Sequence, residues 1–81
     1  MGDDRELITF CDNVRYLRKR HRLTQTEMAK KLHIGIASLR ALERGAFPPR
    51  LGVEVIFYIH KHFGVPPKRI FAPLQEMEEN Q

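Results

Sequence analysis

Hydrophobic positions recur at helical spacing along most of the chain, which predicts an all-α protein. The clearest pattern lies between Gln25 and Gly45. Two short apolar stripes follow each other there across a tight turn, first Met28, Ala29 and Leu32, then Leu39 and Leu42. Polar and basic residues fill the other faces of both segments. The spacing predicts two short helices that share a core, in the arrangement of a helix-turn-helix.

The residues between these two helices favour a tight turn. His33 is expected in the left-handed backbone conformation, which His tolerates better than most residues, and Gly35 is expected to be the N-cap of the second helix. Gly45 is expected to close that helix as a C-terminal cap. We therefore interpret His33 as a turn residue and not as a metal ligand.

Three further helices are predicted by the same periodicity. The first runs from Leu7 or Asp12 to Arg20 and carries the stripe Phe10, Val14 and Leu17. The fourth runs from Val53 to Phe63, ends at Gly64 and carries the stripe Val53, Ile56, Ile59 and Phe63. The fifth begins at Pro66-Pro67, ahead of Ile70 and Phe71. The segment Ala46-Phe47-Pro48-Pro49-Arg50 predicts a stiff connection ahead of the fourth helix.

A chain of 81 residues suits one small domain. We expect an N-terminal segment over residues 1–9, the helical domain over 10–73 and an acidic, frayed tail over 74–81. The single Cys11 excludes an intrachain disulfide and is expected to be a small buried hydrophobe. A reducing, cytoplasmic setting is therefore expected. Because the N-terminal residues lack the pattern of a secretory signal and no apolar run is long enough to span a bilayer, no membrane partner is expected.

Charge is concentrated in the body of the chain. The whole sequence has a net charge of +4, but residues 7–75 carry 13 Lys and Arg against four Asp and Glu, a net charge of +9. Acidic residues gather near the two ends. A strongly basic domain favours a polyanionic partner, although a basic surface alone also suits an anionic membrane or an acidic protein.

No set of residues suggests an enzyme. Ser38 is the only serine and no base accompanies it in a catalytic pattern, while His60 and His62 are two residues apart and so point to different faces of a helix. We therefore predict no catalytic residues, no metal site and no cofactor, and no small-molecule ligand is evident.

Three motifs together resemble the Cro/C1-type (XRE) helix-turn-helix family of bacterial and phage repressors. They are L-T-Q-x-E-x-A-x-x-L at 23–32, I-G at 34–35 and L-x-x-L-E-R-G at 39–45. Arg18, Gly64-Val65 and Ile70-Phe71 extend the similarity, which covers about Phe10 to Phe71. The resemblance implies a compact, lambda-repressor-like bundle of five helices that binds double-stranded DNA with its third helix in the major groove. It also implies a transcriptional regulator, typically a repressor, that binds an inverted repeat as a homodimer.

The resemblance also assigns roles to individual residues. Gln25 resembles the family residue that binds a phosphate, a role that its place in the first turn of a helix favours independently. Thr24 and Thr26 assist it, and Arg44 contacts a phosphate at the end of the third helix. For a DNA-binding protein, the basic residues Lys19, Arg22 and Arg50 are also expected to add attraction for phosphates, apart from the roles that the resemblance assigns. The positions that read bases are Ile36, Ala37, Arg40 and Ala41. Arg18 and Glu43 correspond to a family ion pair that joins the first helix to the third.

The base-reading positions differ from those common in the family. Family members often have Gln, Ser, Thr or Asn where this chain has Ile36 and Ala37, so only Arg40 and Arg44 on that face have hydrogen-bond donors. The apolar side chains at 36, 37 and 41 either contact thymine methyl groups or form a smooth surface that lets Arg40 approach guanine. A different function stays open, in which this face, with Phe47, is an apolar surface that docks a protein partner.

Overall fold

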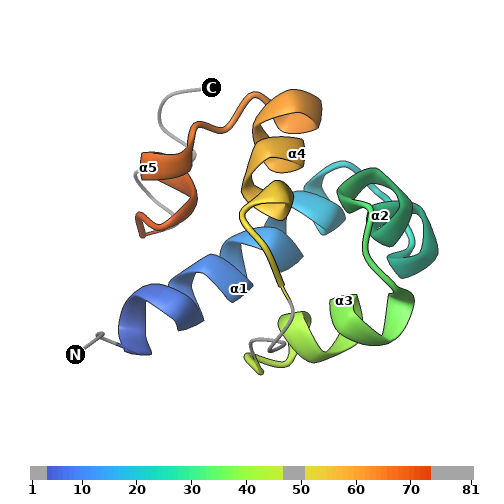
Figure 1. The fold of residues 1–81 in the computed structure, drawn as a ribbon, viewed down its shortest axis with the longest axis horizontal. Coiled ribbons are helices and arrows are strands. Elements are labelled where there is room, and N and C mark those ends of the chain that lie inside the picture. Colours follow the sequence, from blue (N-terminus) through green and yellow to red (C-terminus); the bar gives the residue numbers. More distant parts are fainter. Residues whose placement is uncertain (1–3, 47–50, 74–81) are drawn as a thin grey trace.

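The computed structural model describes residues 4–46 and 51–73, and within these ranges all regular structure is helical. The five helices are α1 (Asp4–Arg20), α2 (Gln25–Leu32), α3 (Ile36–Glu43), α4 (Glu54–Phe63) and α5 (Pro67–Ile70). Figure 1 shows α1 crossing the middle of the molecule, with α3 on one side of it and α5 on the other. The predicted all-α bundle of five helices is confirmed.

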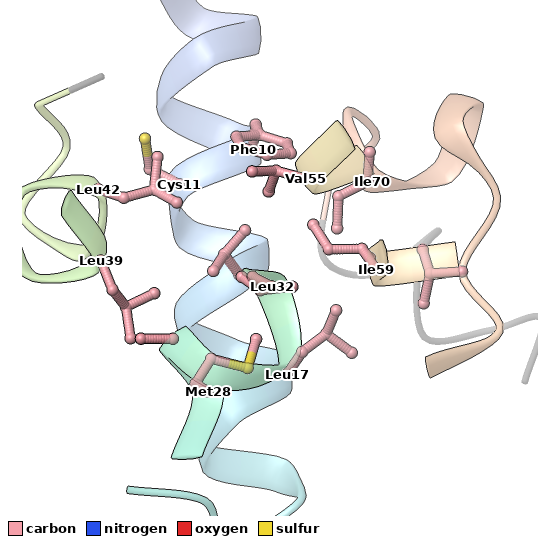
Figure 2. Packing of buried hydrophobic residues seen from close by; sticks show 13 residues of the cluster. Phe10, Cys11, Leu17, Met28, Leu32, Leu39, Leu42, Val55, Ile59 and Ile70 are labelled. Atoms are coloured by element: carbon pink, nitrogen blue, oxygen red, sulfur yellow. The ribbon is translucent and has the colours of Figure 1, made fainter. Parts of the chain in front are cut away.

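The hydrophobic core forms around α1. Figure 2 shows Leu39 and Leu42 of α3 approaching α1 from one side, and Val55, Ile59 and Ile70 of α4 and α5 from the other. α2 packs against both α3 and α4 and so closes the core between them. The fully buried large side chains include those predicted for the stripes of the first three helices: Phe10, Val14, Leu17, Met28, Leu32, Leu39 and Leu42.

The first helix is longer than the sequence pattern predicted. α1 begins at Asp4, ahead of both Leu7 and Asp12. Leu7 and Ile8, in this added part, are 40% and 49% exposed, so their burial cannot be what extends the helix. An acidic residue in the first turn interacts favourably with the positive end of the helix dipole, and Glu6 lies there.

The face that α4 turns to the core is also different from the prediction. Val53 is 81% exposed and precedes the helix as its N-cap, whereas Val55 and Ile59 are buried. Ile56 and Phe63 are half-buried. The predicted stripe was therefore wrong at Val53, and it omitted Val55, because the apolar run from Val55 to Ile59 fits more than one rotation of the helix.

Two buried polar groups belong to α1. The side chain of Asn13 is fully buried, and its Nδ2 donates hydrogen bonds to the carbonyls of Ile70 (2.6 Å) and Ala72 (2.8 Å), which joins the end of α5 to α1. Cys11 is buried and not in a disulfide, as predicted, and burial followed by the charge of Asp12 raises the pKa of its thiol. Such a thiol is a poor nucleophile at neutral pH.

No helix in the part of the chain that the structure describes is long and apolar enough to cross a membrane. The predicted connection at Phe47–Arg50 and the predicted tail lie outside the described residues.

Candidate nucleic-acid interface

α2 and α3 are joined by the turn His33, Ile34 and Gly35. His33 has φ 58° and ψ 41°, the left-handed conformation expected of it. Its N–H donates to the carbonyl of Lys30 (3.2 Å) and that of Ile34 donates to the carbonyl of Ala29 (3.0 Å), the two hydrogen bonds of a Schellman motif. The imidazole of His33 stacks on the ring of Tyr58, with 4.0 Å between ring centroids. Gly35 is the N-cap of α3, as predicted.

Reciprocal hydrogen bonds between Thr24 and Glu27 fix the start of α2. The N–H of Glu27 donates to Oγ1 of Thr24 (3.1 Å), and the N–H of Thr24 donates to Oε1 of Glu27 (2.8 Å). This capping box satisfies two of the backbone donors that a helix start leaves unpaired. The hydrogen bond from the backbone of Thr24 is the largest of the effects that lower the pKa of Glu27. Gln25 is thereby held in the first turn of α2, next to the remaining free N–H groups.

An ion pair between Arg18 and Glu43 joins α1 to α3. Nε of Arg18 lies 2.6 Å from Oε2 of Glu43 and its Nη2 lies 3.0 Å from Oε1, so the contact is bidentate. Nη1 of Arg18 donates to the carbonyl of Leu23 (3.0 Å), just ahead of α2. The side chains are 16% and 6% exposed. The pair therefore fixes the end of α3 relative to both α1 and the start of α2.

The side chain of Gln25 extends this network to the outer face of α3. Its Nε2 donates to Oε1 of Glu43 (3.2 Å), and its Oε1 accepts a hydrogen bond from Nε of Arg40 (3.3 Å). A continuous chain of hydrogen bonds thus runs from Arg18 through Glu43 and Gln25 to Arg40. Within the described residues, the two terminal nitrogens of Arg40 make no hydrogen bond, so they are available to a ligand.

The predicted contact residues differ in exposure. Ala37, Arg40 and Arg44 are exposed on α3, whereas Ile36 and Ala41 are half-buried. Of the other predicted phosphate ligands, Gln25 is half-buried, whereas four are exposed on α1 and around the start of α2; they are Lys19, Arg22, Thr24 and Thr26. Arg50 lies outside the described residues.

An open groove lies between α1 and α3, and Gln25 lines one part of it. We call it the α1–α3 groove. The α1 side chains that line it include Ile8, Asp12, Arg15 and Lys19, which share one face of the helix. On the other side, Arg40 of α3 and its C-cap residue Arg44 line it. The groove is therefore continuous with the surface that carries most of the predicted contact residues.

Comparison of the sequence with known protein families identifies the family of this domain. Residues 14–70 match a family model described as "Helix-turn-helix". The chain belongs to the Cro/C1-type helix-turn-helix family. The match begins within α1 and ends with α5, so this helix-turn-helix domain includes every helix that packs around the α2–α3 motif.

A curated relative has the same motif. The chain is 38% identical over 60 residues to an uncharacterized HTH-type transcriptional regulator of Methanocaldococcus jannaschii, an alignment that covers 74% of this chain and 88% of the relative. No solved structure matches the chain.

The capping box at the start of α2 and the basic face of α1 that lines the α1–α3 groove were not predicted, although the sequence contains a signal for each. Thr24 and Glu27 have the T-x-x-E spacing of a capping box. Arg15 and Lys19 are four residues apart, a spacing that places both on one face of a helix, yet only Lys19 was singled out. No group of three or more His, Cys, Asp or Glu in the described ranges is arranged to hold a metal ion.

Proposed function

We propose that this protein is a sequence-specific DNA-binding transcriptional regulator that inserts α3 into the major groove. The single observation that carries the proposal is the arrangement of Gln25 and Arg40. A side chain at the start of α2, where a phosphate binds well, is hydrogen-bonded to the exposed guanidinium of α3. A phosphate and a base edge lie close together along the wall of a major groove, so one protein surface can contact both.

The proposed roles follow from the chemistry of each side chain. Gln25 binds a phosphate with its backbone N–H and its amide, with help from the hydroxyls of Thr24 and Thr26. Arg40 donates two hydrogen bonds to the O6 and N7 atoms of a guanine. Ala37, with the half-buried Ile36 and Ala41, gives α3 an apolar surface that projects little from the helix. Such a surface suits thymine methyl groups and lets α3 enter the major groove deeply.

Further cations hold the duplex without reading its sequence. Arg44 at the end of α3 contacts a phosphate, and Lys19 and Arg22 add attraction from α1 and the loop that follows it. Arg50 is assigned the same role from the sequence. A domain with this charge balance associates with DNA rapidly, because the basic surface concentrates it near the polyanion.

We also propose that two copies bind an inverted repeat and repress transcription from it in the cytoplasm. The relative in Methanocaldococcus jannaschii carries the name of a transcriptional regulator, which supports a regulatory role here. A single α3 of eight residues contacts few base pairs, so one protomer alone distinguishes few sequences. A second protomer on the same duplex increases the number of base pairs that are read.

Selection of bound duplexes from a random-sequence pool, followed by sequencing, tests the proposal. The expected result is an enriched inverted repeat with a G·C pair at one matching position of each half-site. A pool that stays random after repeated rounds would contradict sequence-specific binding. Enrichment of a single site without a second, inverted half-site would contradict binding as a dimer.

The alternative is an interaction module that docks a protein partner on the face formed by positions 36, 37 and 41. Two of these three side chains are half-buried, so the exposed apolar area on α3 is small. Stable apolar docking needs a contiguous patch. This observation favours the DNA-binding function.

A further inference from the structure

The α1–α3 groove contains a cation to which the predicted DNA contacts assign no role. Five cationic side chains line it, namely Arg15, Arg18, Lys19, Arg40 and Arg44, against two carboxylates, Asp12 and Glu43. The net charge of the lining is therefore +3. Arg18 and Glu43 neutralise each other in their ion pair, so the excess belongs to the other four cations.

Arg15 is the member of this set to which no role has been assigned. It is exposed on the α1 face that lines the groove, one helical turn before Lys19. Four residues of α-helix rise about 6 Å, so Arg15 and Lys19 place two separate cations along the α1 side of the groove.

We propose that the α1–α3 groove is a second phosphate-binding surface, in which Arg15 contacts the DNA backbone beyond the phosphate held at Gln25. The proposal rests on the proposed function, and it extends the interface from the α2–α3 motif onto α1. Because Gln25 lines the same groove, a strand whose phosphate binds at the start of α2 continues along the groove towards Arg15. In this model Asp12 opposes binding, since its carboxylate lies among the cations that face the phosphates.

The opposite charges of Arg15 and Asp12 provide a test in which loss of folding cannot imitate the result. Arg15→Gln and Asp12→Asn each remove one exposed charge and keep the shape of the side chain nearly unchanged. Binding of a fluorescein-labelled duplex of random sequence is measured by anisotropy over a series of NaCl concentrations. Arg44→Gln serves as a variant in the primary interface. Lys61→Gln is the matched control, in the C-terminal turn of α4 at the end of the molecule away from α3 (Figure 1).

Arg15→Gln is expected to weaken binding roughly two- to fivefold, the strength of an exposed ion pair, and to reduce the slope of log K against log salt by about 0.9. Asp12→Asn is expected to strengthen binding by a similar factor, and Lys61→Gln to change it little. If Arg44→Gln weakens binding but neither Arg15→Gln nor Asp12→Asn alters it, the α1 side of the groove does not contact DNA beyond the predicted contacts and this inference is overturned. If the unchanged protein binds no duplex, the proposed function itself fails and the groove proposal with it.

Discussion

Glu43 is the residue on which the geometry of the site most depends, because its carboxylate accepts hydrogen bonds from both Arg18 and Gln25. The guanidinium of Arg18 on α1 thus compensates the charge of this largely buried carboxylate, and the amide of Gln25 on α2 orients it. Removal of either charged partner leaves the other uncompensated in a largely buried place, which costs more than the pair itself contributes.

Arg18→Ala and Glu43→Ala are each expected to lower the free energy of unfolding by about 3–5 kcal/mol, measured by urea denaturation. Lys19→Ala, an exposed neighbour of Arg18, is the control and is expected to change it by less than about 0.5 kcal/mol. The double variant Arg18→Met with Glu43→Leu is expected to recover part of the loss, since no charge is then left unpaired. Single variants as stable as the control would show that the ion pair has no structural role.

Arg40 is expected to set the sequence preference of the protein. On the best duplex, Arg40→Ala should cost about 1–3 kcal/mol of binding free energy and relax the preference at one G·C pair in each half-site. Binding to random sequence should weaken only slightly. Competition titrations against duplexes that differ by single base pairs measure both quantities, and an equal loss on every duplex would make Arg40 a phosphate contact instead.

Variants of Gln25 and Arg44 provide the comparison for Arg40. Arg44→Ala is expected to weaken binding to specific and random duplexes alike, because phosphate contacts carry no sequence information. Gln25→Ala should do the same and, since the amide of Gln25 also accepts the hydrogen bond from Arg40, should additionally relax the G·C preference in part. A Gln25→Ala protein with altered preference but unchanged random-sequence binding would contradict the phosphate role.

The helix ends are where the elements of this protein are most closely specified. α1, α2 and α3 are each followed by a left-handed residue, respectively Arg22, His33 and Gly45. The conformations of His33 and Gly45 were predictable, because Gly favours this region and His tolerates it. That of Arg22 was not, since nothing in its side chain favours a positive φ. Arg22 is the left-handed residue of a Schellman motif that ends α1, in which its N–H donates to the carbonyl of Lys19 (3.1 Å) and the N–H of Leu23 donates to the carbonyl of Arg18 (3.0 Å).

Glu27 makes the start of α2 sensitive to acid. Because the folded protein lowers the pKa of this carboxyl, the ionised form stabilises the fold at pH values above its ordinary pKa. That stabilisation is lost as the pH falls through the lowered folded-state value, where Glu27 becomes protonated. The unchanged protein is therefore expected to lose more thermal stability than Glu27→Gln between neutral pH and about pH 3, since Gln keeps a capping oxygen that does not titrate.

Circular dichroism melts of the two proteins at several pH values check this expectation. Thr24→Ala removes the other half of the capping box and is expected to cost about 0.5–2 kcal/mol at neutral pH. Parallel pH profiles for the unchanged protein and Glu27→Gln would contradict the assigned role of the carboxylate.

Hydrophobic patterns within single helices predicted where the helices lie in the sequence. Contacts between helices determine the rotation of α4 and the side-chain hydrogen bonds of the site, which the sequence did not predict. The stripes of the first three helices were correct because each has a single apolar face. α4 has consecutive apolar residues from Val55 to Ile59, so its rotation depends on which face α2 and α5 cover. Within the candidate site, the positions of Gln25 and Arg40 on their helices followed from the sequence. Their hydrogen bond did not, because it depends on the rotamers of two long side chains and on the angle between α2 and α3.

The distribution of charge over the whole molecule determines how it approaches a polyanion. The body of the chain has a net charge of +9 while acidic residues gather near the sequence ends. The cations proposed to contact phosphates come from several parts of the chain, namely Arg15, Lys19, Arg22, Arg44 and Arg50, so several phosphates are neutralised at once. Each one neutralised releases counterions from the duplex, which makes binding depend steeply on salt.

For one protomer on a duplex of random sequence, neutralisation of four phosphates gives an expected slope of log K against log salt of about −3 to −4. Anisotropy titrations at several NaCl concentrations measure the slope, and the same experiment with sodium glutamate separates the release of cations from competition by the salt anion. Apolar docking to a protein partner depends little on salt in this range, because no counterions are released. A slope near zero would therefore contradict phosphate binding and favour the interaction module, whereas a steep slope that loses about one unit in Arg44→Ala would assign that residue to the interface.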